Sequence, residues 1–272
     1  MVTSFLITLR EGLEASLIIA ILLTYLAKTN RRHEAKYVWI GTGAAIGACL
    51  VAGMLIYVLV DGLHGNAEYA VEGVIALAAA AVLTHMIFWM RKNSQSLSTE
   101  LREKVDRSAK TAVIVIAFVA VVREGLETAL FLLSAETESA SGSSVVIGGL
   151  IGLGVSVVLG YAVFAGGRKV NLKAFFTVTA VLLLLFAAGL AGKFVHEFRE
   201  LIIGDVAPGD SWFVQPAWNI TSGMWAEGTF YDFMRGLFGW HNQAENIRVI
   251  TYFAYLIPVM YLYFRKPAVE SK

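Results

Sequence analysis

Arg10-Glu11-Gly12-Leu13-Glu14 recurs letter for letter as Arg123-Glu124-Gly125-Leu126-Glu127. Both copies lie in apolar runs, which continue as residues 15–20 after the first and as residues 128–133 after the second. A charged side chain at membrane depth is costly, so ionisable residues in such runs usually mark an ion or substrate path. The repeated motif therefore points to a pathway through a membrane.

The spacing within the motif gives it a defined shape on a helix. Glu11 and Glu14 are three residues apart and share a face, while Arg10 and Glu14 are four apart and can pair. Two copies brought together form a carboxylate-rich cage, and oxygen ligands of this kind suit hard cations. We expect the arginine of each copy, Arg10 or Arg123, to limit the repulsion. The alternative is that each Arg–Glu set only joins helices.

The composition places the chain among polytopic membrane proteins. It has 272 residues, of which 57% are hydrophobic and 16% charged, and its mean hydropathy is +0.65. We predict an all-α fold with seven transmembrane helices, because about twenty apolar residues are needed to cross a bilayer. The predicted spans are residues 3–27, 37–60, 69–90, 111–135, 145–167, 174–196 and 247–264. A single cysteine, Cys49, excludes a disulfide framework or thiolate cluster and is expected to be a packing residue.

The charges between the spans predict the orientation. Lys and Arg gather between spans one and two, three and four, and five and six, and after span seven. The alternate connections between spans two and three and between spans four and five carry acidic residues or histidine instead. By the positive-inside rule the N-terminus lies outside and the C-terminus in the cytoplasm.

The order of the spans predicts an inverted repeat of three plus three helices. Residues 1–90 and 111–196 each open with a motif helix, and an odd number of spans reverses the second unit. Transporters with this plan bind substrate between the repeats near mid-membrane. The remaining parts are a cytoplasmic connector at 91–110, with a short helix near 98–103, an outer segment at 197–246 and the seventh helix at 247–264. The outer segment is rich in aromatic residues, so we expect short interfacial helices capping the bundle, with a partner-docking surface as the alternative.

Four further residues are weaker site candidates. Glu72 is a candidate vestibule carboxylate, or a glutamate that remains hydrated at the level of the lipid headgroups. His196 and Glu197 could feed cations inward, or simply mark the end of a span. His85 is a candidate exit ligand, although a buried, hydrogen-bonded histidine is the more common case. Lys193 is expected to reach the outer interface.

The doubled motif in the first and fourth of seven spans resembles that of the oxidase-dependent iron permease family, above all its short bacterial branch. Phe88-Trp89-Met90-Arg91-Lys92 and Ala187-Ala188-Gly189-Leu190-Ala191 support the resemblance, which covers essentially the whole chain. It implies a permease of the bacterial cytoplasmic (inner) membrane that binds iron through the motif glutamates: Glu11, Glu14, Glu124 and Glu127.

The resemblance also implies the partners and the form of the substrate. Iron, as Fe³⁺ after oxidation of Fe²⁺, would come from separate extracytoplasmic iron-binding and oxidase or peroxidase proteins. No permanently bound cofactor and no enzyme activity are expected. The ligand type alone leaves open a carrier of another divalent metal such as Mn or Pb, and an intramembrane redox or proton-relay subunit. The chain has no nucleotide-binding loop, so ATP-driven transport by this chain alone is not expected.

Overall fold

The computed structural model describes residues 1–61, 65–93, 110–137, 142–164, 172–204 and 211–265. Their regular structure is helical, apart from one isolated β-bridge between Pro216 and Glu245, and the all-α prediction is confirmed. The helices are α1 (Val2–Lys28), η1 (Arg32–Glu34), α2 (Ala35–Asp61), α3 (Asn66–Asn93), α5 (Lys110–Thr137), α6 (Gly142–Phe164), α7 (Leu172–Ile203), α8 (Thr229–Phe238) and α9 (Asn246–Phe264).

Each predicted span falls on one of the long helices. The largest difference is at α7, which continues to Ile203 and so places His196 and Glu197 inside the helix. Five helices, α2, α3, α6, α7 and α9, are long and apolar enough to cross a membrane. The motif helices α1 and α5 are not among these five, but their 27 and 28 residues give each a length of about 40 Å at 1.5 Å per residue. The predicted helix near 98–103 lies outside the described residues.

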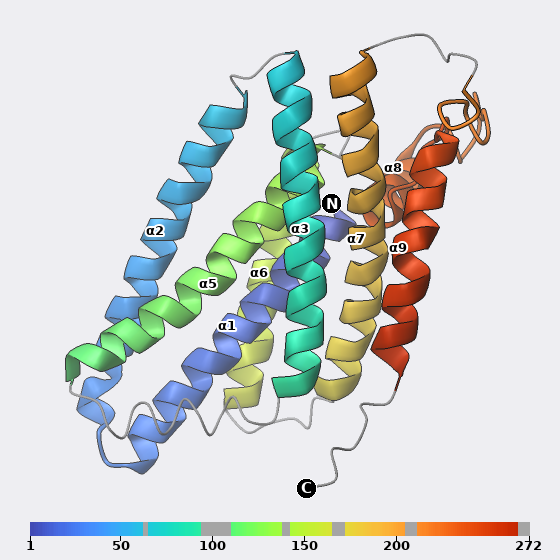
Figure 1. Ribbon diagram of the computed structural model, residues 1–272. Coiled ribbons are helices and arrows are strands. Elements are labelled where there is room, and N and C mark those ends of the chain that lie inside the picture. Colours follow the sequence, from blue (N-terminus) through green and yellow to red (C-terminus); the bar gives the residue numbers. More distant parts are fainter. Residues whose placement is uncertain (62–64, 94–109, 138–141, 165–171, 205–210, 266–272) are drawn as a thin grey trace, which may run out of the picture. The chain divides into compact units, whose positions relative to one another are not determined.

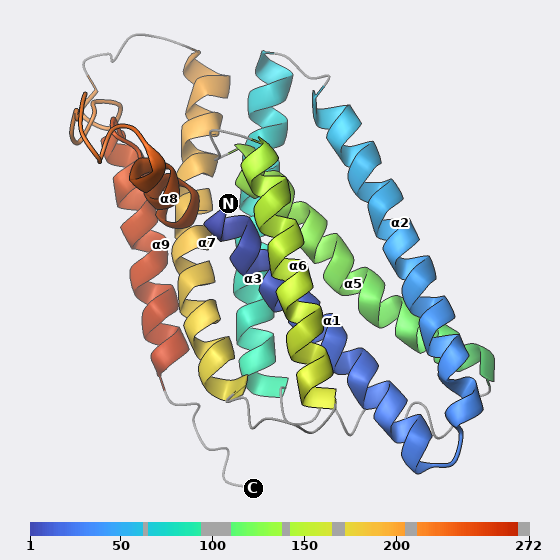
Figure 2. The same cartoon turned by 180° about the vertical axis from the view of Figure 1, so that it is seen from behind.

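The chain divides into two compact units. Unit 1 comprises Met1–Glu68 and Met90–Thr179, and unit 2 comprises Tyr69–Trp89 and Ala180–Lys272. Unit 1 holds both motif helices, with α2 and α6. Figures 1 and 2 show α1 running beside α6, and α5 running beside α2. Each motif helix therefore packs against the helix that follows the other motif helix.

A row of small residues on α6 allows α1 to approach closely. The row has four-residue spacing: Gly148, Gly152, Ser156 and Gly160. These residues meet, in the same order along the chain, the α1 residues Ser4, Thr8, Gly12 and Ser16. Because the residue numbers of the contacting pairs increase together along both helices, α1 and α6 run parallel. Small residues let backbones come close and favour helix association in membranes.

The pair of α2 and α5 repeats this arrangement. The row on α2 is Gly41, Ala45, Cys49 and Gly53, again at four-residue spacing. A Cβ added to Gly41 would overlap the carbonyl oxygen of Ile114, and Gly53 faces the Ala129 methyl group. Ala45 is fully buried. On each pair the third residue of the row, Ser156 or Cys49, faces the glycine of a motif.

Unit 2 is built around α7, which runs opposite to α3 and α9 (Figure 1). Phe88 on α3 meets Tyr263 on α9 edge to face, with ring centroids 6.2 Å apart. Gly189 on α7 lies against Gly239, whose φ of +66° ends α8 in the left-handed conformation that glycine adopts easily. Close contact at this point holds α8 on the side of α7.

The aromatic segment before α9 is mostly irregular. Its described residues contain one short helix, α8, while residues 211–228 form turns and bends, so the expected series of short helices is found only in part. Backbone hydrogen bonds from Ala217 to Ala244 and from Ile220 to Asn242 pair the two ends of this segment. Trp218 stacks on Trp240 with centroids 4.9 Å apart and an interplanar angle of 9°.

Candidate metal centre in the repeated motifs

The first motif copy is buried and internally paired on α1. Arg10 and Glu11 are 2% and 1% exposed, and Glu14 is 6% exposed. Arg10 reaches both carboxylates with different nitrogens, Nη1 lying 3.0 Å from Glu11 Oε1 and Nη2 lying 3.3 Å from Glu14 Oε1. The predicted pairing of Arg10 with Glu14 is therefore present, and the same guanidinium also holds Glu11.

The second copy, on α5, is arranged differently. Glu124 is buried, whereas the Arg123 side chain is 42% exposed. Arg123 Nε lies 3.0 Å from Glu127 Oε1, and Thr128 donates a hydrogen bond of 2.7 Å to the backbone carbonyl of Glu124. The two arginines thus differ in setting, since Arg10 is enclosed and pairs with two carboxylates, whereas Arg123 is partly exposed and pairs with Glu127.

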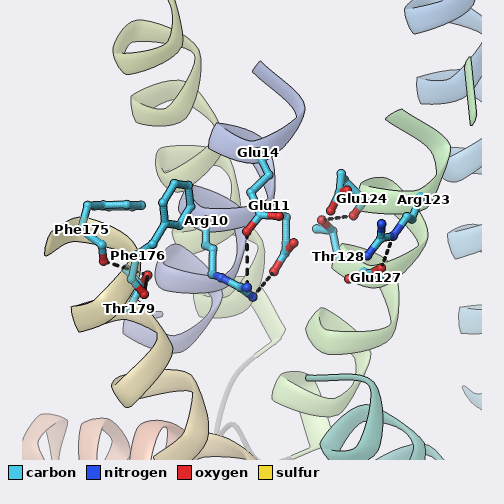
Figure 3. A network of polar contacts seen from close by, with 10 residues as sticks. All are labelled: Arg10, Glu11, Glu14, Arg123, Glu124, Glu127, Thr128, Phe175, Phe176 and Thr179. Atoms are coloured by element: carbon cyan, nitrogen blue, oxygen red, sulfur yellow. Dashed lines mark hydrogen bonds and ion pairs between the residues drawn. The ribbon is translucent and has the colours of Figure 1, made fainter. Parts of the chain in front are cut away.

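The two copies face one another within unit 1 (Figure 3). One carboxylate oxygen from each of Glu11, Glu14 and Glu124 lies within 4.8 Å of the other two. In the part of the chain that the structure describes, Oε2 of Glu11, Glu124 and Glu127 is buried and has no hydrogen-bond partner. Glu127 is held to one side by Arg123 and is not one of the three converging residues. The arrangement offers three close oxygen donors to a cation, and a fourth nearby.

The motif glycines allow this convergence. A Cβ added to Gly12 would overlap the Ser156 hydroxyl oxygen on α6, and a Cβ added to Gly125 would overlap the Cys49 sulfur on α2. Cys49 Sγ lies 3.6 Å from the carbonyl oxygen of Val122. Cys49 therefore packs against α5, as the sequence predicted. The row of small residues on α6 was not singled out from the sequence, although its four-residue spacing is a readable signal.

The other predicted candidates lie in unit 2, where Glu72 joins a buried ion-pair group. Lys193 Nζ lies 2.6 Å from Glu72 Oε2 and 3.8 Å from Glu197 Oε1, and Lys193 is 3% exposed. The expectation that Lys193 reaches the interface was wrong, because two carboxylates compensate its charge in the interior. His85 is exposed, so the expectation of a buried histidine was also wrong.

His196 belongs to a second group at the C-terminal end of α7. Its Nδ1 lies 3.4 Å from Oε1 of Glu245, the residue that precedes α9. Arg199 Nη2 lies 2.8 Å from the same oxygen and also contacts Glu200. Burial raises the pKa of Glu245, but His196 and Arg199 lower it by more, so its pKa lies below the usual value. Sequence reasoning missed Glu200, four residues after His196, and Glu245, whose position no local signal gives.

Long apolar helices around buried, converging carboxylates are typical of membrane transport proteins. The model of the iron permease FTR1 family matches residues 1–264, and the chain belongs to that family. It is 34% identical over 273 residues to the ferrous iron permease EfeU of Yersinia pestis, covering 98% of this chain and 94% of the relative. The ferrous iron permease EfeU of Escherichia coli O6:H1 is equally similar, with 98% and 96% covered. No solved structure matches the chain. With five helices long and apolar enough to cross a membrane, it is a multi-pass membrane protein.

Proposed function

We propose that this chain is a permease that carries iron across the bacterial cytoplasmic membrane through the carboxylates of the two motifs. The observation that carries the proposal is the convergence of Glu11, Glu14 and Glu124 within 4.8 Å in a buried setting. An enclosed group of carboxylates with unpartnered oxygens is unfavourable unless a cation completes it. The names of the relatives, ferrous iron permeases, agree with iron as that cation.

The donors favour Fe³⁺ as the bound form of iron. Carboxylate oxygens are hard ligands and suit Fe³⁺. We propose that Fe²⁺ is oxidised outside the membrane by a separate oxidase or peroxidase protein, passed on with the help of an iron-binding protein, and bound here as Fe³⁺. No cofactor and no enzyme activity are assigned to this chain. Protons replace the metal after release, which makes the transport cycle sensitive to pH.

The packing of each motif helix against the helix that follows the other motif helix supports an inverted repeat. Gly12 meets Ser156 and Gly125 meets Cys49 in equivalent ways, and α1 and α5 run in opposite directions (Figures 1 and 2). We propose that α1 and α5 complete a set of seven spans, with the N-terminus outside and the C-terminus in the cytoplasm. Rocking of one repeat against the other would expose the site alternately.

Uptake into liposomes that contain only the purified protein tests the function. Iron should accumulate with wild-type protein, and Glu14→Gln and Glu124→Gln should abolish uptake while the protein still inserts. Glu127→Gln should be milder, because Glu127 is held aside by Arg123. Glu227→Gln, an exposed change outside both motifs, is the matched control. Normal uptake in both Glu14→Gln and Glu124→Gln would reject the assignment.

The same liposomes separate the alternatives. Fe³⁺, Fe²⁺, Mn²⁺ and Pb²⁺ are offered in turn and in competition. Preferred uptake of Mn²⁺ or Pb²⁺ would identify a carrier of another metal. Redox turnover or proton movement without metal uptake would instead identify a redox or proton-relay subunit.

A further inference from the structure

We propose that His196, Glu200 and Glu245 bind a divalent transition-metal cation, using residues outside the repeated motifs. One ligand atom from each residue lies within 4.8 Å of the other two. His196 and Glu200 are four residues apart on α7 and so share a face, while Glu245 is brought to them by the start of α9. All three residues lie in unit 2.

The unpartnered atoms of this group point to a ligand. Glu200 is 7% exposed, and its Oε2 is buried with no hydrogen-bond partner among the described residues. Glu245 Oε2 is also buried and lacks a hydrogen-bond partner there, and the buried His196 Nδ1, although 3.4 Å from Glu245 Oε1, makes no hydrogen bond. Buried polar atoms are nearly always hydrogen-bonded, so three in one place need an explanation. A bound cation would satisfy all three at once.

The charge of the group favours a cation as well. Two carboxylates share the single guanidinium of Arg199, whose Nη2 contacts both Glu200 and Glu245 Oε1. With His196 neutral, the group carries one net negative charge. Arg199 compensates the carboxylates while no metal is bound, and an incoming cation takes over that position. The His196 side chain is 32% exposed, so an ion can reach this group from the surface.

The donor set selects the kind of metal. A neutral imidazole with two carboxylates suits first-row divalent ions, whereas the motif carboxylates offer oxygen alone. Bonds of about 2.1 Å hold ligand atoms roughly 3–4 Å apart, so small side-chain rotations would close the group around an ion. Ferrous iron and Mn²⁺ both meet these requirements. This inference does not depend on the transport assignment, because it concerns binding alone.

Mn²⁺ binding to the full-length protein in detergent micelles tests the proposal. Pulsed electron paramagnetic resonance of bound Mn²⁺ should show coupling to one imidazole nitrogen in the wild-type protein, and His196→Gln should remove it. Glu200→Gln should weaken this binding by more than roughly tenfold, since loss even of an outer-shell partner commonly weakens a metal site 10–100-fold. Glu227→Gln should change neither the coupling nor the affinity.

A motif variant separates this site from the proposed transport site. Glu11→Gln/Glu14→Gln should keep the nitrogen coupling, even if it loses iron uptake. The wild-type measurement needs no substitution and so does not depend on any variant folding. Absence of nitrogen coupling in the wild type, or its persistence in His196→Gln, would overturn the proposal.

Discussion

Ser156 lies against Gly12 so closely that no side chain fits between them, and the hydroxyl oxygen occupies the place where a Cβ would stand. Cys49 holds the same position beside Gly125. These two contacts set how near each motif helix comes to its partner. The carboxylates are carried by the same turns of α1 and α5, so the contacts also set where the carboxylates lie.

Alanine at either motif glycine should destabilise the protein. Gly12→Ala and Gly125→Ala each force apart a close-packed helix pair, and overpacking of this kind costs about 1–3 kcal/mol. Thermal unfolding in detergent micelles should show lower midpoints for both variants. Ser156→Gly should restore part of the loss in the Gly12→Ala background, since it removes the atoms that clash.

Gly43 provides the matched control for this experiment. It lies on α2, and nothing stands within 4 Å of a Cβ added there. Gly43→Ala should therefore leave the midpoint unchanged or raise it. Equal losses at Gly43 and Gly12 would contradict the role of the helix contact, because alanine has a higher helix propensity than glycine and no contact opposes it at Gly43.

Lysine should replace Arg123 more easily than Arg10. Arg10 uses two nitrogens to hold Glu11 and Glu14, and a single ammonium group does not reproduce that fork. Arg123 Nε contacts Glu127, and the Arg123 side chain is 42% exposed, so solvent offsets part of any change in its contacts. Losing one charge-assisted hydrogen bond is worth about 1.5–3 kcal/mol, equivalent to roughly tenfold or more in an equilibrium constant.

Iron uptake into liposomes measures this difference. Arg10→Lys should lower uptake at low iron concentration by roughly tenfold or more, from the same free-energy loss, while Arg123→Lys should stay near wild type. The amount of inserted protein is measured in parallel for each variant. Equal sensitivity at the two positions would contradict the different roles assigned to the two arginines.

Removing the charge of Lys193 should be among the most damaging single changes in unit 2. Lys193→Met leaves Glu72 and Glu197 without their buried cation, and breaking a buried ion pair by removing one partner costs about 3–5 kcal/mol. Lys193→Met combined with Glu72→Gln should recover part of the loss, because fewer uncompensated charges remain. Thermal unfolding of the single and double variants measures the coupling energy between Lys193 and Glu72. Strictly additive losses of stability would contradict their ion pair.

The sequence was informative where a local pattern carries the geometry. The motif spacing predicted that Glu11 and Glu14 share a face and that Arg10 pairs with Glu14, and the apolar runs predicted the long helices. It also predicted that the two copies meet, from the inverted repeat, in which the substrate is bound between the two units near mid-membrane. Cys49 was placed correctly as a packing residue because it is the single cysteine of the sequence and lies in an apolar run.

The remaining features depend on contacts between distant segments. Nothing near Lys193 in the sequence marks Glu72 as its partner, so the usual expectation of a snorkelling lysine failed. Glu245 reaches His196 only because α9 begins beside the end of α7. The packing of α1 on α6 and of α5 on α2 also depends on such contacts. Each pair meets along a row of small residues, and the spacing within a row does not show which helix will pack against it.

The packing of α1 against α6 has a consequence for biosynthesis. Gly12 leaves the ribosome long before Ser156 exists, and at about 5–20 residues per second the delay is on the order of ten seconds. During this interval α1 is present without its neighbour α6, although its arginine and glutamates are already made. Arg10 pairs with Glu11 and Glu14 on the same helix and needs no group from α6 to do so, so we expect this pairing to offset part of the charge of α1 until α6 is made.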